Sequence, residues 1–362
     1  MDKEKNIYFF SNKKKIRDIR KMINYKKIKF YNFEDFYEIL SKLNSPFFTI
    51  DNLTCSIYYL SLINSKFIIN NFEDPIYILK SIKNKVEIKN MKSAHIKDGA
   101  ALTKFLYWIK QNKNFGFDEL SLEKKLETFR KKNKDYIYPS FNTIAGSGPN
   151  SAIIHYRSSK KTNRKIKKND IFLCDSGGQY RYGTTDVTRT VCFSKPSERI
   201  RNIFTRVLKG HIAVATNDLN KIKKGYLIDK KARAPLSEIN LDYGHGTGHG
   251  VGFFSNVHEG PQAISKFNAI ELKEGMIVSN EPGYYEEGKF GIRIENLIYI
   301  KKEKKKLKFK NLTMAPIDKD LIEQKMLTSK EKNYLLNYNL EVYSNVSNFL
   351  NRNEKSWLLK SI

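Results

Sequence analysis

Apolar positions in the first part of the chain come in short runs with two different spacings. Ile28–Tyr31 and Phe47–Ile50 are rich in aromatic and β-branched residues and predict strands. Phe36–Leu40 has helical spacing, and Asp74–Pro75 opens another short helix. Short strands alternating with helices predict a small βαβ-type unit over residues 1–88. No group of catalytic residue types stands out in it.

A second pattern begins near Lys89, where apolar residues recur every three or four positions. The two stripes are Leu102, Phe105, Leu106 and Ile109, and Leu122, Leu126 and Phe129. They predict two amphipathic helices that face a core. From Tyr138 to about Ile300 the chain is rich in strand-like runs and glycine turns.

The C-terminal part returns to helical patterns. Lys301–Lys308 is predicted to be a charged turn, and Leu321–Met326 and Tyr334–Val346 are predicted to be helices.

Composition changes this picture little. The chain has 362 residues and is 40% hydrophobic, which allows a sizeable core and about two domains. The net charge of +28 would suit a nucleic-acid-binding protein. However, the lysines are spread along the whole chain among Asn and Ile and form no single dense patch. We therefore predict solvated surface lysines and no nucleic-acid partner.

Cysteine usage and the N-terminal residues bear on the compartment. Cys55, Cys174 and Cys192 form no CxxC pair, and an odd number suits a reducing compartment better than a disulfide framework. The N-terminus lacks the apolar core of a signal peptide. Residues 55–70, the most apolar stretch, are too short and too polar to cross a bilayer. We predict a cytoplasmic protein without a membrane segment.

Two aspartates flank a glycine-rich segment. Asp175 follows the apolar run Ile171–Cys174, and Asp186 comes after a turn rich in Gly, Tyr and Thr. A hairpin there would bring both carboxylates to one end of a sheet, with Thr188 among the hydroxyls able to orient them. Two aspartates that only cap turns would give the same pattern. This pair alone leaves both interpretations open.

Two histidines, His245 and His249, lie in the run from His245 to Gly252, in which residues 246, 248, 250 and 252 are all glycine. The glycines argue against a helix and favour a strand or loop that a ligand can approach closely. One of His245 and His249 is a plausible metal ligand, and the other would face a substrate.

Two glutamates complete the group. Glu281 precedes a Pro-Gly turn, and Glu295 lies in a segment of alternating residues that puts it on the same face as Arg293. Arg293 could balance charge and orient a carboxylate, or the two could be a plain surface pair. Four carboxylates and one imidazole together are the ligand set of a two-metal hydrolase that activates water.

Longer motifs carry a resemblance from about Met91 to the C-terminus. They are Ala152–Tyr156, Thr162–Arg164, Asp175–Tyr180, Gly183–Thr190, Val207–His211, Leu241–Gly252, Val257–Pro261, Glu281–Tyr285, Phe290–Asn296 and Leu312–Asp318. The chain resembles metallopeptidases with the pita-bread fold, and most closely the cytosolic-type Xaa-Pro aminopeptidases. The resemblance implies an α+β fold, with a small N-terminal creatinase-like α/β domain (partial, 1–88), a pita-bread catalytic domain (89–302) and its C-terminal extension (303–362).

The family pattern implies a role for each site residue. Asp175 would hold one metal, and Asp186 and Glu295 would bridge both. His249 and Glu281 would complete the second metal site, and Glu281 would also shuttle a proton. Family histidines that bind substrate and the tetrahedral intermediate match His155, His245 and His258. Arg293 and Thr188 would support the ligands.

The same resemblance implies two Mn²⁺ ions, peptide substrates with proline at the second position, and a homodimer. One departure stands out, because relatives carry two domains before the catalytic one and only about 88 residues precede it here. The first of those domains is therefore expected to be absent. This leaves two alternatives, a pita-bread module that only binds a partner and a truncated inactive relative.

Overall fold

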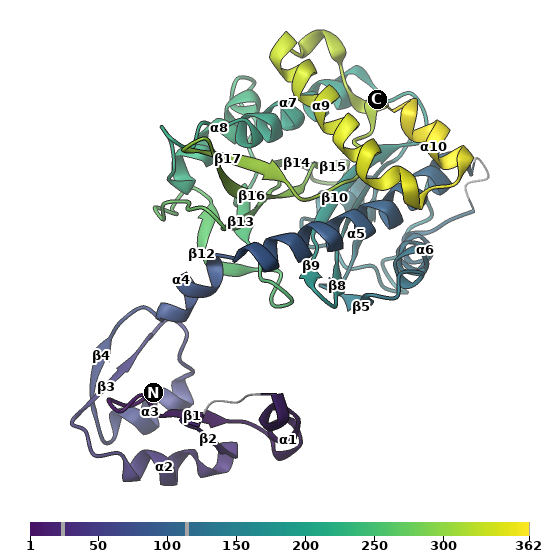
Figure 1. Cartoon of the computed structure of the whole chain (residues 1–362). Helices are drawn as coiled ribbons and strands as arrows, with labels where there is room; N and C mark the ends of the chain where they lie inside the picture. The colour runs from purple at the N-terminus through teal and green to yellow at the C-terminus, as the bar shows by residue number, and fades with distance from the viewer. Residues whose placement is uncertain (23–25, 113–115, 362) are drawn as a thin grey trace. The chain divides into compact units, whose positions relative to one another are not determined.

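The computed structural model describes residues 1–22, 26–112 and 116–361. The chain divides into two compact units, Met1–Ile76 and Tyr77–Ile362, which are described separately (Figure 1).

The smaller unit is built from two pairs of parallel strands with helices between them. Its elements are β1 (Ile7–Phe10), α1 (Lys13–Met22), β2 (Ile28–Tyr31), α2 (Phe36–Lys42), β3 (Phe47–Ile50), α3 (Ile57–Asn64) and β4 (Ile68–Asn71). Strand β1 pairs with β2 and β3 pairs with β4. Leu40, Ile63 and Phe67 form its buried centre. The βαβ prediction and the predicted bounds of β2 and β3 are confirmed.

The smaller compact unit ends at Ile76. Helix α4 (Pro75–Ser81) crosses the division at Ile76, and the residues after it join the larger unit. Ile82 forms an isolated β-bridge with Met276, and the backbone N–H of Lys83 donates to Gly275 O. Such long-range pairing leaves no local signal in the sequence.

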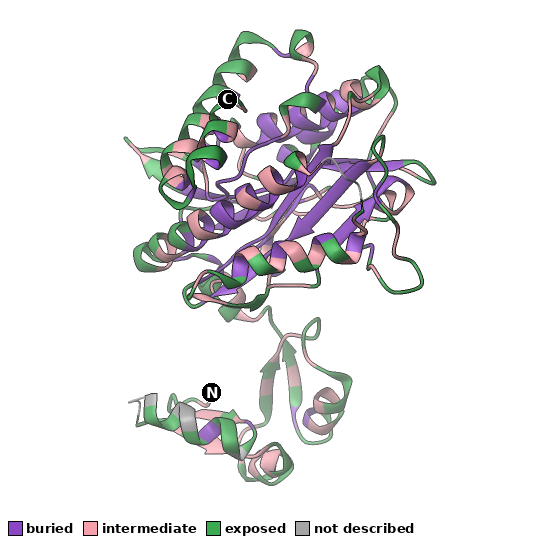
Figure 2. Cartoon of the chain, turned by 90° about the vertical axis from the view of Figure 1, so that its right-hand side faces the viewer, coloured by how far each residue is buried: buried purple, intermediate pink, exposed green. Residues whose placement is uncertain are grey.

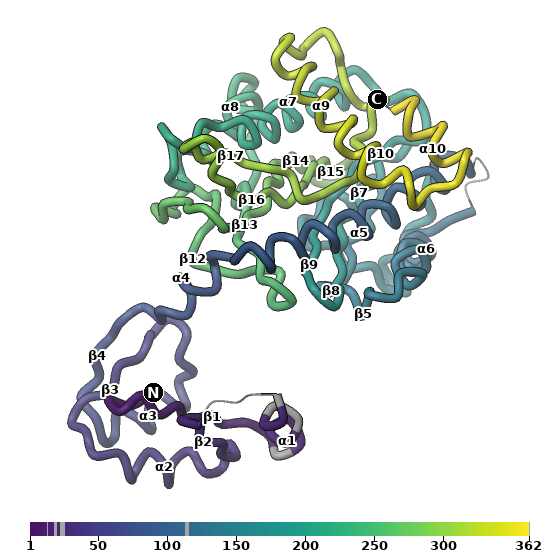
Figure 3. The backbone as a smooth tube through the Cα atoms, viewed as in Figure 1, coloured from purple at the N-terminus to yellow at the C-terminus, as the bar shows by residue number. Residues whose placement is uncertain are grey.

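The two predicted amphipathic helices are present as α5 (Lys85–Gln111) and α6 (Glu119–Lys131). Asn84 is the N-cap of α5, and its side chain accepts hydrogen bonds from the N–H groups of Val86 and Glu87. The Glu87 carboxylate accepts from the Asn84 N–H in return. The predicted stripes of both helices are buried, except for half-buried Phe129. Helix α5 packs against α6 and against the C-terminal helices (Figure 3).

Antiparallel sheets form the interior of the larger unit. One contains β10 (Val187–Cys192), β7 (Ile171–Ser176) and β6 (Ile144–Ser147) in that order; the largest runs β12 (Glu259–Ile264), β11 (Gly248–Gly250), β13 (Ile277–Asn280), β16 (Asn296–Glu303), β17 (Lys306–Asn311). Two smaller sheets contain β5 (Tyr136–Pro139), β8 (Gly178–Tyr180) and β9 (Gly183–Thr184), and β14 (Gly283–Glu286) with β15 (Phe290–Arg293). Helices α7 (Glu198–Ala215) and α8 (Gly225–Ser237) pack against each other, and the interior strands are largely buried (Figure 2).

The predicted charged turn at Lys301–Lys308 is wrong. Strands β16 and β17 pair through this segment up to Glu303 and Lys306, and only Lys304 and Lys305 form the turn, both with positive φ. A two-residue turn of this kind suits the twist of a hairpin. Lysines on the exposed face hid the alternation.

The C-terminal predictions are partly confirmed. Residues 319–321 and 324–326 form two short 3-10 turns, where a single helix was predicted over Leu321–Met326. Helix α9 (Ser329–Val346) contains the second predicted helix, and α10 (Arg352–Leu359) follows. Along the parts of the chain that the structure describes, no helix has both the length and the apolar character needed to cross a membrane.

Candidate active site

Both predicted aspartate ligands lie at one end of the sheet formed by β10, β7 and β6. Asp175 is in β7, and Asp186 directly precedes β10, which returns antiparallel with Thr188 opposite Asp175. The predicted return of the chain is confirmed, although β8 and β9 between the two aspartates pair with each other and β8 with β5. Both aspartate side chains are buried.

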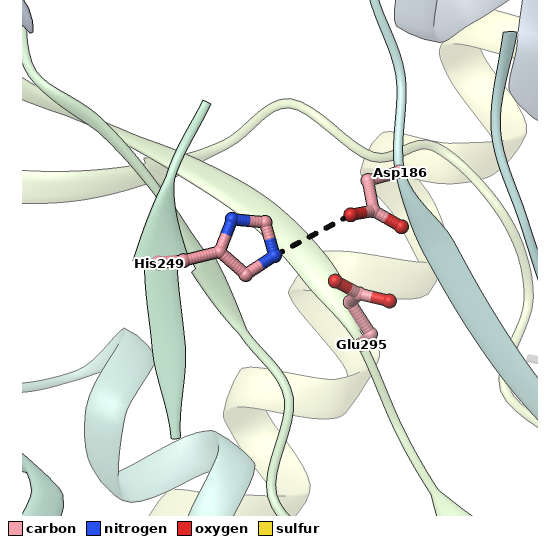
Figure 4. A group of neighbouring side chains, drawn as sticks. All are labelled: Asp186, His249 and Glu295. Carbon is pink, nitrogen blue, oxygen red and sulfur yellow. Dashed lines mark ion pairs between the residues drawn. The ribbon is translucent and has the colours of Figure 1, made fainter. Parts of the chain in front are cut away.

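His249 faces these carboxylates from β11, in a strand as its glycine neighbours predicted. Its Nε2 lies 3.5 Å from Asp186 Oδ2 and 3.4 Å from Glu281 Oε1, and Figure 4 shows the ring directed at Asp186 with Glu295 beside it. Its Nδ1 lies 2.9 Å from the carbonyl oxygen of Gly250. A carbonyl only accepts, so a neutral ring carries its proton on Nδ1 and turns the Nε2 lone pair to the carboxylates. A lone pair among carboxylates calls for a cation.

Arg293 and Thr188 form hydrogen bonds with the carboxylates and with each other. Arg293 Nη2 donates to Asp175 Oδ2 at 2.7 Å, and Arg293 Nε donates to Thr188 Oγ1 at 3.1 Å. Thr188 Oγ1 in turn donates to Glu295 Oε2 at 2.8 Å. Arg293 is buried. This network orients two of the four carboxylates and offsets part of their charge.

The site is strongly electronegative. Burial, then the charges of Asp175 and Glu281, raise the pKa of Asp186 well above its usual value. Burial and the charge of Asp186 do the same to the pKa of Glu295. Oδ1 of Asp175 and Oδ1 of Asp186 are buried, and neither has a hydrogen-bond partner among the described residues. Ligand atoms of Asp186, His249 and Glu295 lie within 4.8 Å of one another. Unpaired anionic oxygens with one imidazole fit divalent cations.

The five residues line one cavity of about 470 Å³, together with His155, His245 and His258. The His258 ring packs edge-on against His249, with ring centroids 4.2 Å apart. Burial lowers the pKa of His245 to about 3 and that of His258 to about 4, so both are neutral near pH 7. His155 is exposed. The structure therefore brings every predicted ligand and histidine to one place.

Tyr285 belongs to this site and was not predicted as a functional residue. Arg293 Nη1 donates to its hydroxyl oxygen at 2.6 Å, and the hydroxyl lies 2.8 Å from His245 Nε2. Because His245 Nδ1 faces the Gly246 carbonyl, the tyrosine O–H donates to Nε2. Only its place in the motif Glu281–Tyr285 could have singled it out.

Ser279 and Gly248 explain part of the glycine pattern. Ser279 Oγ accepts from the His249 N–H at 2.9 Å and donates to Glu281 Oε1 at 3.0 Å. A Cβ on Gly248 would lie 2.0 Å from the Ser279 carbonyl oxygen. Only glycine lets β11 come close enough for this contact.

Comparison with known proteins agrees with this geometry. Residues 89–302 match metallopeptidase family M24, and residues 305–362 match the C-terminal region of peptidase M24. The chain belongs to metallopeptidase family M24. An M24 relative, a probable Xaa-Pro aminopeptidase P of Laccaria bicolor, is 46% identical over 299 residues, which cover 78% of this chain and 47% of the relative.

Solved structures show the same fold. An X-prolyl aminopeptidase of Caenorhabditis elegans, described as a cytosolic enzyme with a di-nuclear active site, superposes with a TM-score of 0.87 at 31% identity, covering 99% of this chain and 61% of that one. The prolidase of Pyrococcus furiosus has a TM-score of 0.70 at 27% identity, with coverages of 84% and 86%. The predicted α+β pita-bread fold is confirmed. The chain spans about half the length of the curated M24 relatives it matches.

A buried ion pair supports β12, the strand that begins directly after His258, in this member of family M24. Lys83 Nζ lies 2.5 Å from Oε1 of Glu259, the residue after His258, and both side chains are almost fully buried. Lys80 Nζ lies 3.4 Å from the other oxygen of Glu259. Removing one partner of such a pair leaves an unpaired buried charge.

We expect Lys83→Met to lower the free energy of unfolding by about 3 kcal/mol, the lower end of the usual cost because Lys80 remains. Lys83→Met/Glu259→Gln, which removes both charges, should lose less. Urea unfolding of the three proteins measures both values. A double variant as unstable as the single one would show that the pair stabilises the fold through packing instead of charge.

Proposed function

We propose that the chain is an aminopeptidase that releases the first residue of peptides with proline at the second position, using two divalent ions, which we take to be Mn²⁺. The observation that carries the proposal is the convergence of Asp175, Asp186, His249, Glu281 and Glu295 on one cavity, with two carboxylate oxygens left without partners. The complete ligand set speaks against a module that only binds a partner.

The proposed chemistry divides the work among these residues. Two ions held by the five ligands would lower the pKa of a shared water and supply hydroxide near neutral pH. Glu281, which lines the cavity, would carry a proton to the leaving proline nitrogen. Neutral His258 can donate one N–H to a carbonyl oxygen that gains charge, whereas the one N–H of neutral His245 already faces the Gly246 carbonyl. Tyr285, itself held by Arg293, donates to His245 Nε2 and keeps the ring in this tautomer beside the ligands.

The proposed substrate class rests on the similarity of this chain to proteins that are named for their substrates. The relatives are named for cleavage of Xaa-Pro bonds, and the identity to Laccaria bicolor covers most of this chain. A cytosolic location, as stated for the Caenorhabditis elegans enzyme, is proposed on the same ground. The homodimer and the division at residues 88 and 302 stay predictions.

The proposal is tested by the release of arginine from Arg-Pro-Pro. We expect metal-stripped protein to be inactive and added Mn²⁺ to restore release, measured by chromatography of the products. Arg-Ala-Pro is the matched control peptide and should be cleaved far more slowly. Absence of release while metal analysis finds two bound ions would contradict the proposed activity.

A further inference from the structure

Arg157 is a cation at the cavity that none of the proposed steps uses. It is exposed, it lines the same cavity as the ligands, and its guanidinium makes no hydrogen bond or ion pair with any described residue. Arg293, the other arginine of the lining, is fully engaged by Asp175, Thr188 and Tyr285. A free guanidinium beside a peptide-sized cavity is suited to bind a carboxylate in a forked pair.

Hydrogen bonds to a buried glutamate hold the loop that carries Arg157. Tyr156 is buried, and its hydroxyl donates to Glu119 Oε2 at 2.7 Å. Glu119 has no exposed surface and also accepts from the Ser147 N–H at 2.8 Å and the Arg164 N–H at 3.0 Å. The carboxylate of Glu119 is therefore hydrogen-bonded to residues at the start, in the middle and at the end of this loop. Preorganisation of this kind reduces the entropy lost when a ligand binds.

The position of the loop sets the distance to the metal ligands. Ser158 Oγ donates to the carbonyl oxygen of Ala145 in β6, and β6 pairs with β7, in which Asp175 lies opposite Ile144. The loop therefore lies beside β6, the strand next to β7, and Arg157 lines the same cavity as Asp175. A tripeptide spans about 10 Å when extended. A short substrate with its amine at the ligands would therefore end near Arg157.

We propose that Arg157 binds a carboxylate of the substrate beyond the scissile bond, and that it thereby favours short peptides with a free C-terminus. The inference rests on the proposed peptidase function and adds a specificity determinant to it. Glu123 on α6 is the anion within the protein that could compete for Arg157. Burial raises the pKa of Glu123, and the positive charge of Arg157 opposes this rise without reversing it. The two side chains form no ion pair. The carboxylate could belong to the C-terminus or to an acidic side chain after proline.

The test compares Arg-Pro-Pro with its C-terminal amide. In wild type we expect kcat/KM to favour the free acid, and in Arg157→Gln we expect this preference to fall about tenfold through KM, as for one partly exposed charged hydrogen bond. Lys160→Gln, in the same loop but outside the cavity, should keep the preference. A second pair, the amides of Arg-Pro-Glu and Arg-Pro-Gln, shows whether a side-chain carboxylate is bound as well.

Equal losses for acid and amide would overturn the proposal, because they would mean that the loop merely positions His155. An unchanged preference would overturn it too. Calorimetry of Pro-Pro and Pro-Pro amide on the Mn²⁺-loaded protein separates this inference from the proposed function. If wild type releases nothing from either peptide, the peptidase proposal fails, yet selective loss of Pro-Pro binding in Arg157→Gln would still support Arg157 as the carboxylate site.

Discussion

Glu281→Gln should lower turnover of Arg-Pro-Pro about a thousandfold while most of the bound Mn²⁺ remains. Gln keeps the shape of Glu281, and its amide oxygen can still accept from Ser279 Oγ, which lies 3.0 Å away in the wild type. It cannot take up and release a proton at neutral pH. Loss of a positioned proton carrier typically costs about 10²–10⁴-fold. The measurement is kcat at saturating Mn²⁺, with metal content from elemental analysis of the same samples.

Two comparisons make this result specific. Glu286→Gln changes a glutamate in the same strand as Tyr285, one whose carboxylate pairs with Arg199 at 2.8 Å on the surface, and it should leave turnover nearly unchanged. Asp186→Asn should lose more metal than Glu281→Gln does. Turnover of Glu281→Gln close to wild type would contradict the shuttle role. Metal loss equal to that of Asp186→Asn would reduce Glu281 to a ligand.

Most of the candidate site could be predicted because its ligands carry local signals. Asp175 follows a buried strand, His249 lies among glycines, and Glu281 precedes Pro-Gly, so each setting is readable within a few residues. The resemblance then orders these residues into roles. Tyr285 escaped because its partners, His245 and Arg293, are defined by contacts between strands and not by spacing.

What could not be predicted depends on long-range contacts. Glu119 reads as the first residue of an amphipathic helix, yet it is a buried acceptor for a loop more than twenty residues away. The hairpin of β16 and β17 was missed because Leu307 and Phe309 alternate with lysines that the whole chain contains in excess. A compositional bias of this kind masks the period-two pattern of a strand.

Asp186→Asn should have opposite effects on the two forms of the protein. The metal-free variant should be more stable than metal-free wild type at pH 7.5, because at that pH wild type must either bury a charge that Asp175 and Glu281 repel or hold a proton that the unfolded chain has lost, and Asn requires neither. Mn²⁺ should then stabilise the variant far less than wild type. For wild type, saturation at a hundred times Kd corresponds to about 2.7 kcal/mol, or about 4 °C in Tm for a chain of this length.

The pH dependence shows why the metal-free variant should be more stable than metal-free wild type. Since the pKa of Asp186 is raised in the folded state, the folded protein keeps this proton above pH 3.8, where the unfolded chain loses it. The stability contributed by this proton is therefore fully present below pH 3.8 and is lost as the pH rises through the pKa of Asp186 in the folded protein. His245 and His258, with pKa values lowered to about 3 and about 4, act in the opposite direction but only below about pH 6.5. Above it, neither histidine contributes, and the difference between wild type and variant follows Asp186 together with the carboxylates whose charges act on it.

Thermal unfolding in chelator, from pH 6.5 to 8.5, measures this difference, and the same scans with Mn²⁺ measure the metal effect. Asp170→Asn is the matched control, because Asp170 pairs with Arg164 at 3.0 Å away from the ligands. That variant should lose stability with and without metal and keep the full gain from Mn²⁺. A metal-free Asp186→Asn protein less stable than wild type at pH 7.5 would mean that this carboxylate is compensated within the protein, and that a cation is not what holds the site together.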